Sequence, residues 1–409
     1  MSSRLLQSDT QLNQESYYEA SVHRPSFNPS LHHDLEVDVV VIGAGFAGLS
    51  TALELRLKGY SVVVLEADKV AAGASGRNGG QAIVGYASGM DLIEQQLGTH
   101  HANMLWQSSL DAIDLIDQRI AKYKIECARV KGYQYVADSR KKAIQLEKEM
   151  LHYESRYGLK TAITTGSDVK NYINSDQYHL CAYENISGHL HPLQYGLGLA
   201  KAVVQEGGQI YENTAVLQLI KGATVIAKTK NAQVKAKFAV IAGNCTLHEY
   251  GSKVAPELKG RIMPVGTYII GTSPIHPLLQ DQLLPNNAAV CDNNFILDYF
   301  RFSQDHRMLF GGRVSYSTKT PYQLKEKMQA RMLTIFPQLA STTIDYVWGG
   351  FVDISMNRAP DFGRTDQNIY YLQGFSGHGV ALTGLAGQLV ANAIQGDAEK
   401  LDVFSKIIS

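Results

Sequence analysis

The feature that most constrains this chain is the glycine pattern Gly43-Ala-Gly45-Phe-Ala-Gly48, together with the segments that flank it. Residues 38–42 form an apolar, β-branched run of the kind found in buried parallel strands. The leucines of the following segment, 45–58, recur at helical spacing, and a second apolar run over 61–65 ends at Glu66. This order predicts a strand–helix–strand unit whose glycine turn binds the phosphates of a dinucleotide.

Each residue of the pattern has a physical role in such a unit. Gly43 permits the tight turn from strand to helix, Gly45 lets the backbone approach a pyrophosphate, and Gly48 lets the helix touch the strand. The helix N-terminus attracts the phosphates, and Glu66 accepts hydrogen bonds from ribose hydroxyls. The predicted cofactor contacts here are Gly43, Ala44, Gly45, Phe46, Ala47, Gly48, Glu66 and Ala67. The alternative is a structural turn that binds no nucleotide.

A second glycine-rich segment, residues 73–80, favours FAD over NAD. An acid at position 66 suits an unphosphorylated ribose, which disfavours NADP. A glycine-rich loop close behind it exposes backbone N–H groups to a flat ring or a second phosphate. Arg77 is a candidate for the pyrophosphate, and Asn78 or Gln81 for the polar edge of the flavin. The predicted contacts are Gly73, Ala74, Ser75, Gly76, Arg77, Asn78, Gly79, Gly80 and Gln81. The alternative is a flexible surface loop.

A third glycine cluster, residues 374–379, links an expected strand over 369–373 to an expected helix over 380–394. Such a turn places a helix N-terminus at the carboxyl end of a strand, where α/β sheets bind ligands. That N-terminus would stabilise negative charge near flavin N1 and the C2 carbonyl. His378 either adds to this effect or is a plain capping residue. The predicted contacts are Phe375, Ser376, Gly377, His378, Gly379 and Val380.

Composition excludes several classes of partner. Lys plus Arg and Asp plus Glu each number 38 in 409 residues, and 45% of the residues are hydrophobic. This argues against a polybasic nucleic-acid binder and against a charged, disordered chain. The longest uncharged stretch near the start, residues 39–53, is shorter than the roughly 20 residues of a membrane-spanning helix. We therefore expect a soluble protein.

Targeting and metal signals are weak. The first 14 residues lack the apolar run of a secretory signal, and the four cysteines form no CxxC pair. Both observations favour a reducing, cytoplasmic compartment, and the second argues against a zinc ribbon. His189 and His191 alternate as metal ligands do, but no third ligand cluster accompanies them, so we expect no metal.

Strand-like and helix-like segments alternate at both ends of the chain. In the middle, strand-like runs are separated by turn residues, as in an antiparallel sheet. The predicted class is α/β: a Rossmann-like FAD-binding domain with an inserted α+β substrate domain containing a mostly antiparallel sheet. We assign 1–36 to an N-terminal arm, 37–90, 190–250 and 355–409 to the FAD-binding domain, and 91–189 and 251–354 to the substrate domain. Further expected elements are helical texture over 91–160, helices over 192–206 and 322–335, and strands over 238–242, 268–270, 295–302 and 308–310.

Several motifs resemble one superfamily. The complete glycine fingerprint, ASGRNGGQ at 74–81, HP at 191–192 and GFSGHGV at 374–380 resemble the FAD-dependent amine and amino-acid oxidases, which include D-amino acid oxidase, glycine oxidase and sarcosine oxidase. Within them the chain is most similar to the gamma-glutamylputrescine oxidases, through SYYEAS at 16–21, LDYFRFSQDHRMLFGGR at 297–313 and NRAPDFGR at 357–364. The resemblance covers residues 16–395.

The resemblance implies further cofactor contacts at Val216, Ala242 and Gly243. It also implies noncovalent FAD. Some relatives attach the flavin through a C-terminal cysteine, and no cysteine follows Cys291. Others use a histidine near the second glycine loop, and none lies between His33 and His100.

Flavin-dependent amine oxidation moves a hydride from the carbon next to nitrogen to flavin N5, so the protein chiefly positions a neutral amine. Besides His378, we place Tyr299, Arg301 and Trp348 among the candidate catalytic residues. Tyr299 and Arg301 alternate on an expected strand and so share a face. Arg301 is either an anchor for a substrate carboxylate, such as that of a glutamyl group, or a structural ion pair. Trp348, beside two glycines, is either a pocket wall or a core aromatic.

Three functions remain open. The first is an FAD oxidase of a gamma-glutamylated amine that produces an aldehyde, ammonia and hydrogen peroxide, with oxygen or another electron acceptor as its partner. The second is an FAD-dependent dehydrogenase or oxidase of D-amino or N-methyl amino acids. The third is a flavin-binding assembly or sensor protein without turnover, which the intact loops around the flavin edge disfavour.

Overall fold

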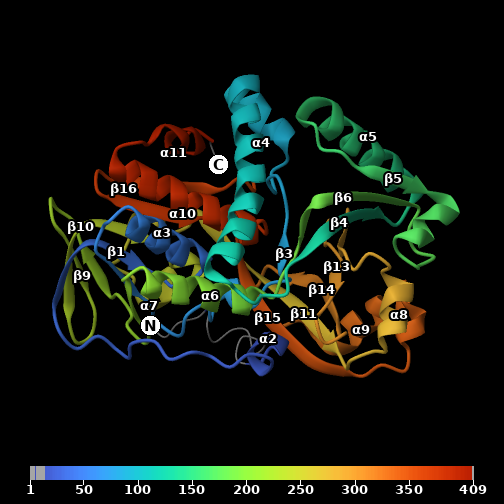
Figure 1. The fold of residues 1–409 in the computed structure, drawn as a ribbon, viewed down its shortest axis with the longest axis horizontal. Coiled ribbons are helices and arrows are strands. Elements are labelled where there is room, and N and C mark those ends of the chain that lie inside the picture. Colours follow the sequence, from blue (N-terminus) through green and yellow to red (C-terminus); the bar gives the residue numbers. More distant parts are fainter. Residues whose placement is uncertain (1–4, 6–13, 408–409) are drawn as a thin grey trace.

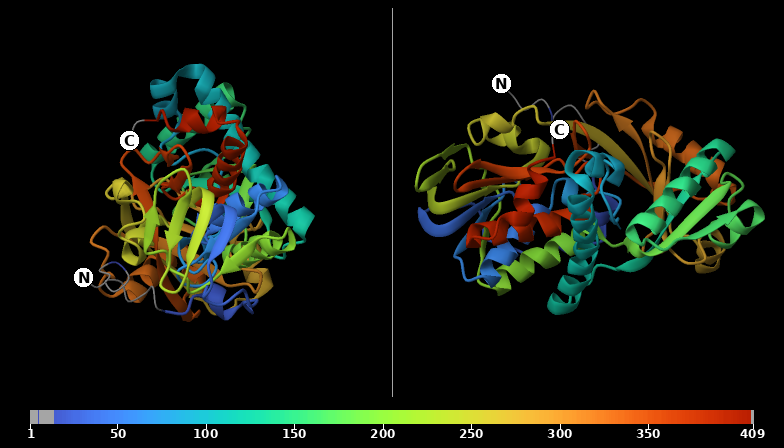
Figure 2. Two further views of the ribbon diagram at one scale, coloured as in Figure 1. Left: turned by 90° about the vertical axis from the view of Figure 1, so that its left-hand side faces the viewer. Right: turned by 90° about the horizontal axis from the view of Figure 1, so that it is seen from above.

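The computed structural model describes residue 5 and residues 14–407. Residues 1–4 and 6–13 of the expected N-terminal arm, and with them most of the start that lacks a signal run, lie outside the described residues. The described chain forms two sheets, at the left and right of Figure 1, with the long helix α4 (Met90–Tyr123) between them. The right-hand view of Figure 2 shows the same division from above.

The first sheet has the parallel order expected of a nucleotide-binding domain. Strands β17, β10, β1, β2 and β7 run parallel in that order, and β16 is antiparallel to β17 at one edge. The hairpin β8–β9 pairs with β10. The bounds are β1 Leu35–Ile42, β2 Val62–Leu65, β7 Gln209–Tyr211, β8 Gln218–Ile220, β9 Val225–Lys228, β10 Gln233–Ile241, β16 Asp361–Asp366 and β17 Ile369–Gln373.

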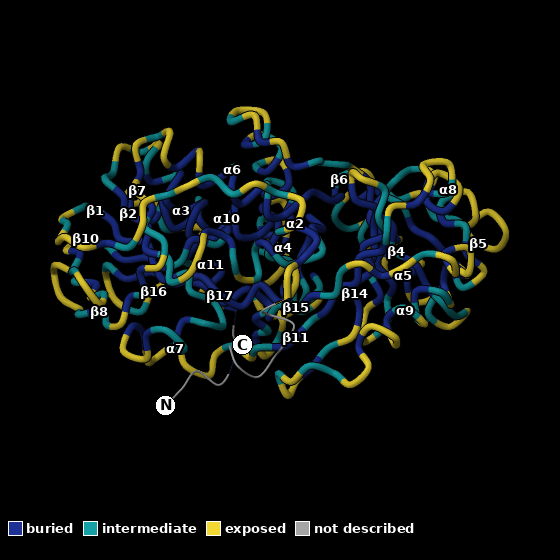
Figure 3. The backbone as a smooth tube through the Cα atoms, turned by 90° about the horizontal axis from the view of Figure 1, so that it is seen from below, coloured by how far each residue is buried: buried dark blue, intermediate teal, exposed yellow. Residues whose placement is uncertain are grey.

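Both faces of this sheet are buried, which explains its continuous apolar strands. Val39 and Val41 pack against helices α3 (Phe46–Leu57) and α10 (Gly379–Gln395) on one face. Val40 and Ile42 pack on the other face against the β8–β9 hairpin and the segment that includes α7 (Leu247–Tyr250). In Figure 3 these central strands are dark blue, whereas the exposed residues lie mainly at rims and turns. The α/β class and the Rossmann-like sheet are confirmed.

The second sheet follows the order β15-β11-β14-β13-β12-β4-β6-β3, with β5 paired to β6. Its described pairings are antiparallel except that β12 runs parallel to β4. The bounds are β3 Gln81–Ala82, β4 Val130–Ala137, β5 Ala162–Thr165, β6 Leu180–His189, β11 Ile262–Thr272, β12 Ala289–Asp292, β13 Tyr299–Phe302, β14 Met308–Ser315 and β15 Ile344–Ser355.

Helices cover this second sheet unevenly. Helices α8 (Pro277–Leu283) and α9 (Leu324–Ile335) pack on one face, against Phe300, Phe302 and Phe310. Helix α5 (Arg140–Tyr157) covers the other face only at its β4–β6 end. Within the described chain, no helix of the second sheet covers the rest of that face, whose Ile269, Leu309 and Trp348 belong to the same core as α3 and α10. The remaining helices are α2 Tyr17–Ala20, α6 Pro192–Gln205 and α11 Glu399–Phe404.

Three sequence-based expectations are corrected. The helical texture over 91–160 is interrupted by strand β4, whose Gly132 adopts a φ of +114° at a register shift opposite β6. The strand expected over 238–242 begins earlier, at Gln233. The strand expected over 295–302 is formed only from Tyr299, because residues 293–298 form a loop.

The assigned domain boundaries stay a prediction, but two elements cross them. β3 lies in the segment assigned to the FAD-binding domain, yet it pairs with β6 of the second sheet. Most of α4 lies in the segment assigned to the substrate domain, yet the helix packs against α10, which lies in the segment assigned to the FAD-binding domain. Such exchange occurs where a chain crosses between sheets, because the connecting elements belong to both cores.

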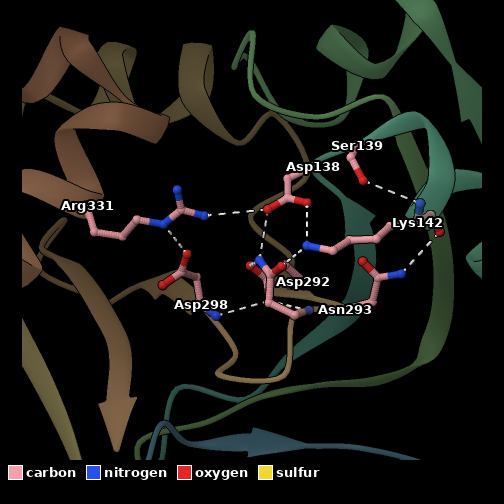
Figure 4. Close-up of polar contacts among 8 residues, drawn as sticks. Asp138, Ser139, Lys142, Asp292, Asn293, Asp298 and Arg331 are labelled. Carbon is pink, nitrogen blue, oxygen red and sulfur yellow. Dashed lines mark hydrogen bonds and ion pairs between the residues drawn. The ribbon is translucent and has the colours of Figure 1, made fainter.

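A polar cluster anchors the loop over 293–298 (Figure 4). Asp298 accepts a hydrogen bond from Arg331 of α9, and Asp138 accepts one from Lys142 Nζ at 2.8 Å. Asn293 Nδ2 donates to the Lys142 carbonyl at 3.2 Å. The cluster therefore joins the loop to α9 and to the start of α5.

Candidate functional site

A cavity of about 310 Å³ lies at the carboxyl ends of β1, β2 and β10. Of the residues predicted to contact the cofactor, its wall contains Gly43, Gly45, Phe46, Ala47, Glu66, Ala67, Gly73, Ala74, Ser75, Arg77, Val216, Ala242, Gly243 and Phe375. All three glycine segments therefore reach one cavity. The predicted contacts outside its wall are Ala44, Gly48, Gly76, Asn78, Gly79, Gly80, Gln81, Ser376, Gly377, His378, Gly379 and Val380.

The first glycine turn leaves no room for side chains. Gly43 has a φ of +106°, and a Cβ placed on it would lie 2.6 Å from the Ala242 carbonyl oxygen. A Cβ on Gly48 would lie 1.9 Å from the Gly43 carbonyl oxygen. These distances are far below van der Waals contact, so the turn, β10 and α3 touch through backbone atoms.

Glu66 and Ser75 tie this turn to its neighbours. The Glu66 carboxylate accepts hydrogen bonds from the Ala44 N–H at 2.6 Å and the Asp68 N–H at 2.9 Å. Burial raises the pKa of Glu66, and these hydrogen bonds oppose that shift. Ser75 Oγ accepts from the Phe46 N–H, at the start of α3, at 2.9 Å. The first and second glycine segments are therefore held together by a direct hydrogen bond.

The second glycine segment is folded by its own side chains. Asn78 Nδ2 donates to the carbonyls of Ala74 and Ser75, and its Oδ1 accepts from the Gly80 N–H at 2.7 Å. Gln81 donates to the Val290 carbonyl and accepts from the Tyr133 hydroxyl. Contact of these two side chains with the flavin edge stays a prediction and would compete with these bonds.

Tyr299 lies directly against the second glycine segment. A Cβ on Gly79 would lie 2.8 Å from Tyr299 Cε2, and one on Gly311 would lie 2.0 Å from both Cε2 and Cζ. The tyrosine ring thus occupies a space that two glycines leave open. It is half-buried, and burial raises its pKa.

We expect the Gly311→Ala substitution to lower the free energy of unfolding by about 1–3 kcal/mol, because the new methyl group overlaps this ring. In a Tyr299→Ala background the additional loss should be smaller by about 1 kcal/mol or more. Urea unfolding of the four proteins measures the difference. Gly350→Ala is the matched control, since its Cβ would meet only Arg77 Cβ, at 3.5 Å. An equal loss in both backgrounds would contradict the steric explanation.

Trp348 lies behind the second glycine segment. Trp348 is 0% exposed. The indole N–H donates to the Arg77 carbonyl at 2.9 Å, and the ring packs edge-on against Tyr18 with centroids 5.4 Å apart. Trp348 lines neither of the two cavities described here and packs as a core aromatic behind the loop, and its role as a catalytic residue stays a prediction.

The guanidinium of Arg301 likewise bonds to other residues of the protein. Its Nε donates to the Gly79 carbonyl at 2.7 Å, and Nη2 donates to the Leu190 carbonyl at 3.0 Å and the Tyr18 hydroxyl at 3.1 Å. Only 4% of the residue is exposed. The expected alternation with Tyr299 on β13 is present, but the guanidinium joins three segments and has no carboxylate partner among the described ion pairs. Its role as a carboxylate anchor stays a prediction.

The third glycine segment carries His378 into the start of α10. His378 is half-buried, and its Nδ1 has no hydrogen-bond partner among the described residues. Burial lowers its pKa to about 4. Its ring does not cap the helix. Gly377 adopts a φ of +100° and is exposed, with no protein atom near the position of a Cβ.

Sequence reasoning missed part of the cavity wall. The additional residues are Ile42, Leu65, Asp68, Ala71, Ala72, Asn244, Cys245, Thr246, Leu247, Tyr250, Gly350, Phe351, Leu372 and Thr383. Residues 244–247 follow directly on β10, a buried parallel strand. The rule that ligands bind beyond the carboxyl ends of such strands would have included them.

A second, polar cavity of about 250 Å³ lies beside α2 and the start of α6. Its wall consists of Tyr17, Ser21, Ala128, His191, Gln194, Arg301, Ser303, Gln304 and Asp305. Arg301 therefore reaches this cavity and not the first one. His191 bonds Ser21 Oγ at 3.0 Å and accepts from the Gln194 N–H at 3.2 Å. Within residues 5 and 14–407, no group of three or more His, Cys, Asp or Glu is placed to hold a metal ion.

Comparisons with known proteins agree with this geometry. Residues 38–393 match a family model described as DAO, FAD dependent oxidoreductase. The chain is 40% identical over 393 residues to the gamma-glutamylputrescine oxidoreductase of Escherichia coli, which covers 96% of this chain and 91% of that protein. It is 42% identical over 394 residues to the probable oxidoreductase OrdL of Haemophilus influenzae, with 95% and 90% covered.

Solved structures show the same fold at low sequence identity. Glycine oxidase from Geobacillus kaustophilus superposes with a TM-score of 0.74 at 19% identity, covering 88% of this chain and 95% of its own. The L-amino acid deaminase from Proteus myxofaciens, in complex with anthranilate, superposes with a TM-score of 0.75 at 18% identity, covering 94% of both chains. No helix among the described residues is long and apolar enough to cross a membrane.

Proposed function

Since the chain belongs to the FAD dependent oxidoreductase family matched over residues 38–393, we propose that it oxidises the CH–NH₂ group of a gamma-glutamylated amine such as gamma-glutamylputrescine. The amine, water and, as electron acceptor, oxygen are consumed, and the proposed products are an aldehyde, ammonia and hydrogen peroxide. The observation that carries the substrate is 40% identity to the Escherichia coli gamma-glutamylputrescine oxidoreductase over nearly the whole of both chains.

The residues present fit noncovalent FAD. The cavity wall includes glycines of the first two segments and Phe375 of the third, and Gly45 brings the backbone of the first turn to its surface without a side chain. We propose that residues 43–48 hold the pyrophosphate, that Glu66 holds the ribose, and that residues 377–380 contact the pyrimidine edge. When bound, FAD supplies the hydride acceptor.

The chain's own contribution is positional and electrostatic. At neutral pH His378 is uncharged, because burial lowers its pKa to about 4. The positive potential at the pyrimidine edge is therefore assigned to the N–H groups at the start of α10, and not to an imidazolium. The absence of that charge also favours a neutral amine nearby, which is the form that can lose a hydride. Tyr299 is proposed to face the substrate from the uncovered part of the second sheet.

We also propose that the protein acts in the cytoplasm. All four cysteines, Cys127, Cys181, Cys245 and Cys291, are free thiols, which agrees with a reducing compartment.

An anaerobic reduction screen tests the function. We expect gamma-glutamylputrescine to bleach the flavin of the purified holoprotein faster than putrescine by about tenfold or more, a difference of about 1.4 kcal/mol in the barrier. D-amino acids, glycine and sarcosine should leave the bound flavin oxidised. In the control without protein, free FAD mixed with each amine should also stay oxidised. Bleaching by amino acids but not by gamma-glutamylputrescine would favour the amino-acid oxidase alternative. A flavin that no amine bleaches would favour the sensor alternative.

A further inference from the structure

One buried acid organises the loop that leads into α10. Asp353, in β15, is 4% exposed. Its Oδ2 accepts hydrogen bonds from the Gly374 N–H at 2.5 Å and the Phe375 N–H at 3.3 Å. Its backbone carbonyl accepts from the Ser376 N–H at 3.1 Å. Three successive N–H groups of the loop are thus bound to a single residue.

The loop requires such support because its conformation is strained. Gly374 and Gly377 have φ angles of +74° and +100°, and Ser376, which has a side chain, has a φ of +52°. A non-glycine residue in this region costs on the order of 1 kcal/mol. Ser376 Oγ in turn accepts from the Ser355 N–H at 3.2 Å. Strand β15 therefore binds the loop through two residues, Asp353 and Ser355.

Burying the Asp353 carboxylate without a cation costs free energy of folding. Among the described residues no Lys or Arg pairs with it, whereas its neighbour Asp361 accepts a hydrogen bond from Arg261 at 2.7 Å. A buried carboxylate without a cation is penalised by desolvation. Burial accordingly raises the pKa of Asp353 to about 6, although the two N–H groups oppose the shift. The conformation that Asp353 imposes on the loop therefore explains its position better than a gain in stability does.

We propose that Asp353 is a positioning residue for FAD: its carboxylate holds residues 374–376 so that the first N–H groups of α10 point at the pyrimidine edge of the flavin. This inference rests on the proposed contact between residues 377–380 and the flavin. Asp353 itself does not line the cavity.

Two variants separate positioning from folding. Asp353→Asn keeps an acceptor oxygen and removes the charge, whereas Asp353→Ala removes both. Because the folded-state pKa is raised above the ordinary value of 3.8, the wild-type apoprotein loses stability as pH rises through about 6. Asp353→Asn lacks this loss, so its melting temperature relative to wild type should rise between about pH 4 and pH 7 and stay level above that. The variant is therefore expected to remain folded where FAD binding is measured.

The decisive measurement is the dissociation constant of FAD from each apoprotein at pH 8, by quenching of flavin fluorescence. Asp353→Ala should raise it by about tenfold or more, the equivalent of one hydrogen bond, and should shift the visible absorption band of the bound flavin. Asp353→Asn should stay within about threefold of wild type, because the acceptor is retained. Asp298→Asn removes another buried acid, which bonds to Arg331 in the polar cluster of Figure 4 and does not line the cavity, and it should leave the constant unchanged.

Two different results would overturn the proposed role of Asp353. If Asp353→Ala binds FAD as tightly as wild type, with an unshifted spectrum, Asp353 does not position the flavin. If wild-type apoprotein binds no FAD, the proposed cofactor site itself fails, and the inference fails with it.

Discussion

Gly48→Ala is expected to abolish useful FAD binding. The new Cβ would lie 1.9 Å from the Gly43 carbonyl oxygen and 3.2 Å from Val41 Cγ1, and neither neighbour is the flexible end of a side chain. The start of α3 must move away from β1, which takes its N–H groups off the pyrophosphate position. We expect the FAD dissociation constant to rise by about two orders of magnitude, or about 2.8 kcal/mol. Overpacking of this kind also lowers the free energy of unfolding by about 3 kcal/mol.

Isothermal titration of the apoprotein with FAD and urea unfolding measure the two effects. The control is Gly222→Ala, whose Cβ would meet only the Thr224 carbonyl oxygen, at 3.4 Å. It should match wild type in affinity. A Gly48→Ala protein with wild-type affinity would show that the turn does not carry the phosphates.

Arg301→Met is expected to be the most destabilising replacement of a charged side chain in the second sheet. It leaves the carbonyls of Gly79 and Leu190 and the Tyr18 hydroxyl without their donor. Leaving buried acceptors without a donor costs about 1–3 kcal/mol each. The loss should appear in the apoprotein, because none of these bonds involves a ligand.

This outcome separates the two roles considered for Arg301. If the guanidinium instead anchored a substrate carboxylate, Arg301→Met would raise KM and leave urea unfolding unchanged. Arg364→Met is the control, since Arg364 is exposed and pairs with Asp402 at the surface. It should cost less than about 1 kcal/mol.

The sequence predicted the backbone of the site better than its side chains. Glycine spacing reports where a backbone must turn or touch, and the three segments meet at one cavity. Side-chain roles depend on partners far along the chain. Trp348 and Arg301 were considered for the pocket because of their chemical types. Their hydrogen bonds to Arg77 and Gly79 become visible only in three dimensions.

The same reason explains the elements that were missed or misread. Strand β4 lies within a region of helical composition, because its pairing with β6 and β12 outweighs local propensity. Asp353 is one of two acids in β15, and the N–H groups that its carboxylate binds lie more than 20 residues further on. Local patterns carry no signal for such long-range contacts.

The short helix α2 has a consequence for the order in which the protein assembles. Tyr18 is 0% exposed, and it contacts His191, Arg301 and Trp348, which come from three later parts of the chain. None of these partners exists when Tyr18 is synthesised. The contacts of α2 can therefore be completed only after β13 and β15 have been synthesised. A nascent chain stalled before residue 348 lacks the Trp348 ring that packs edge-on against Tyr18.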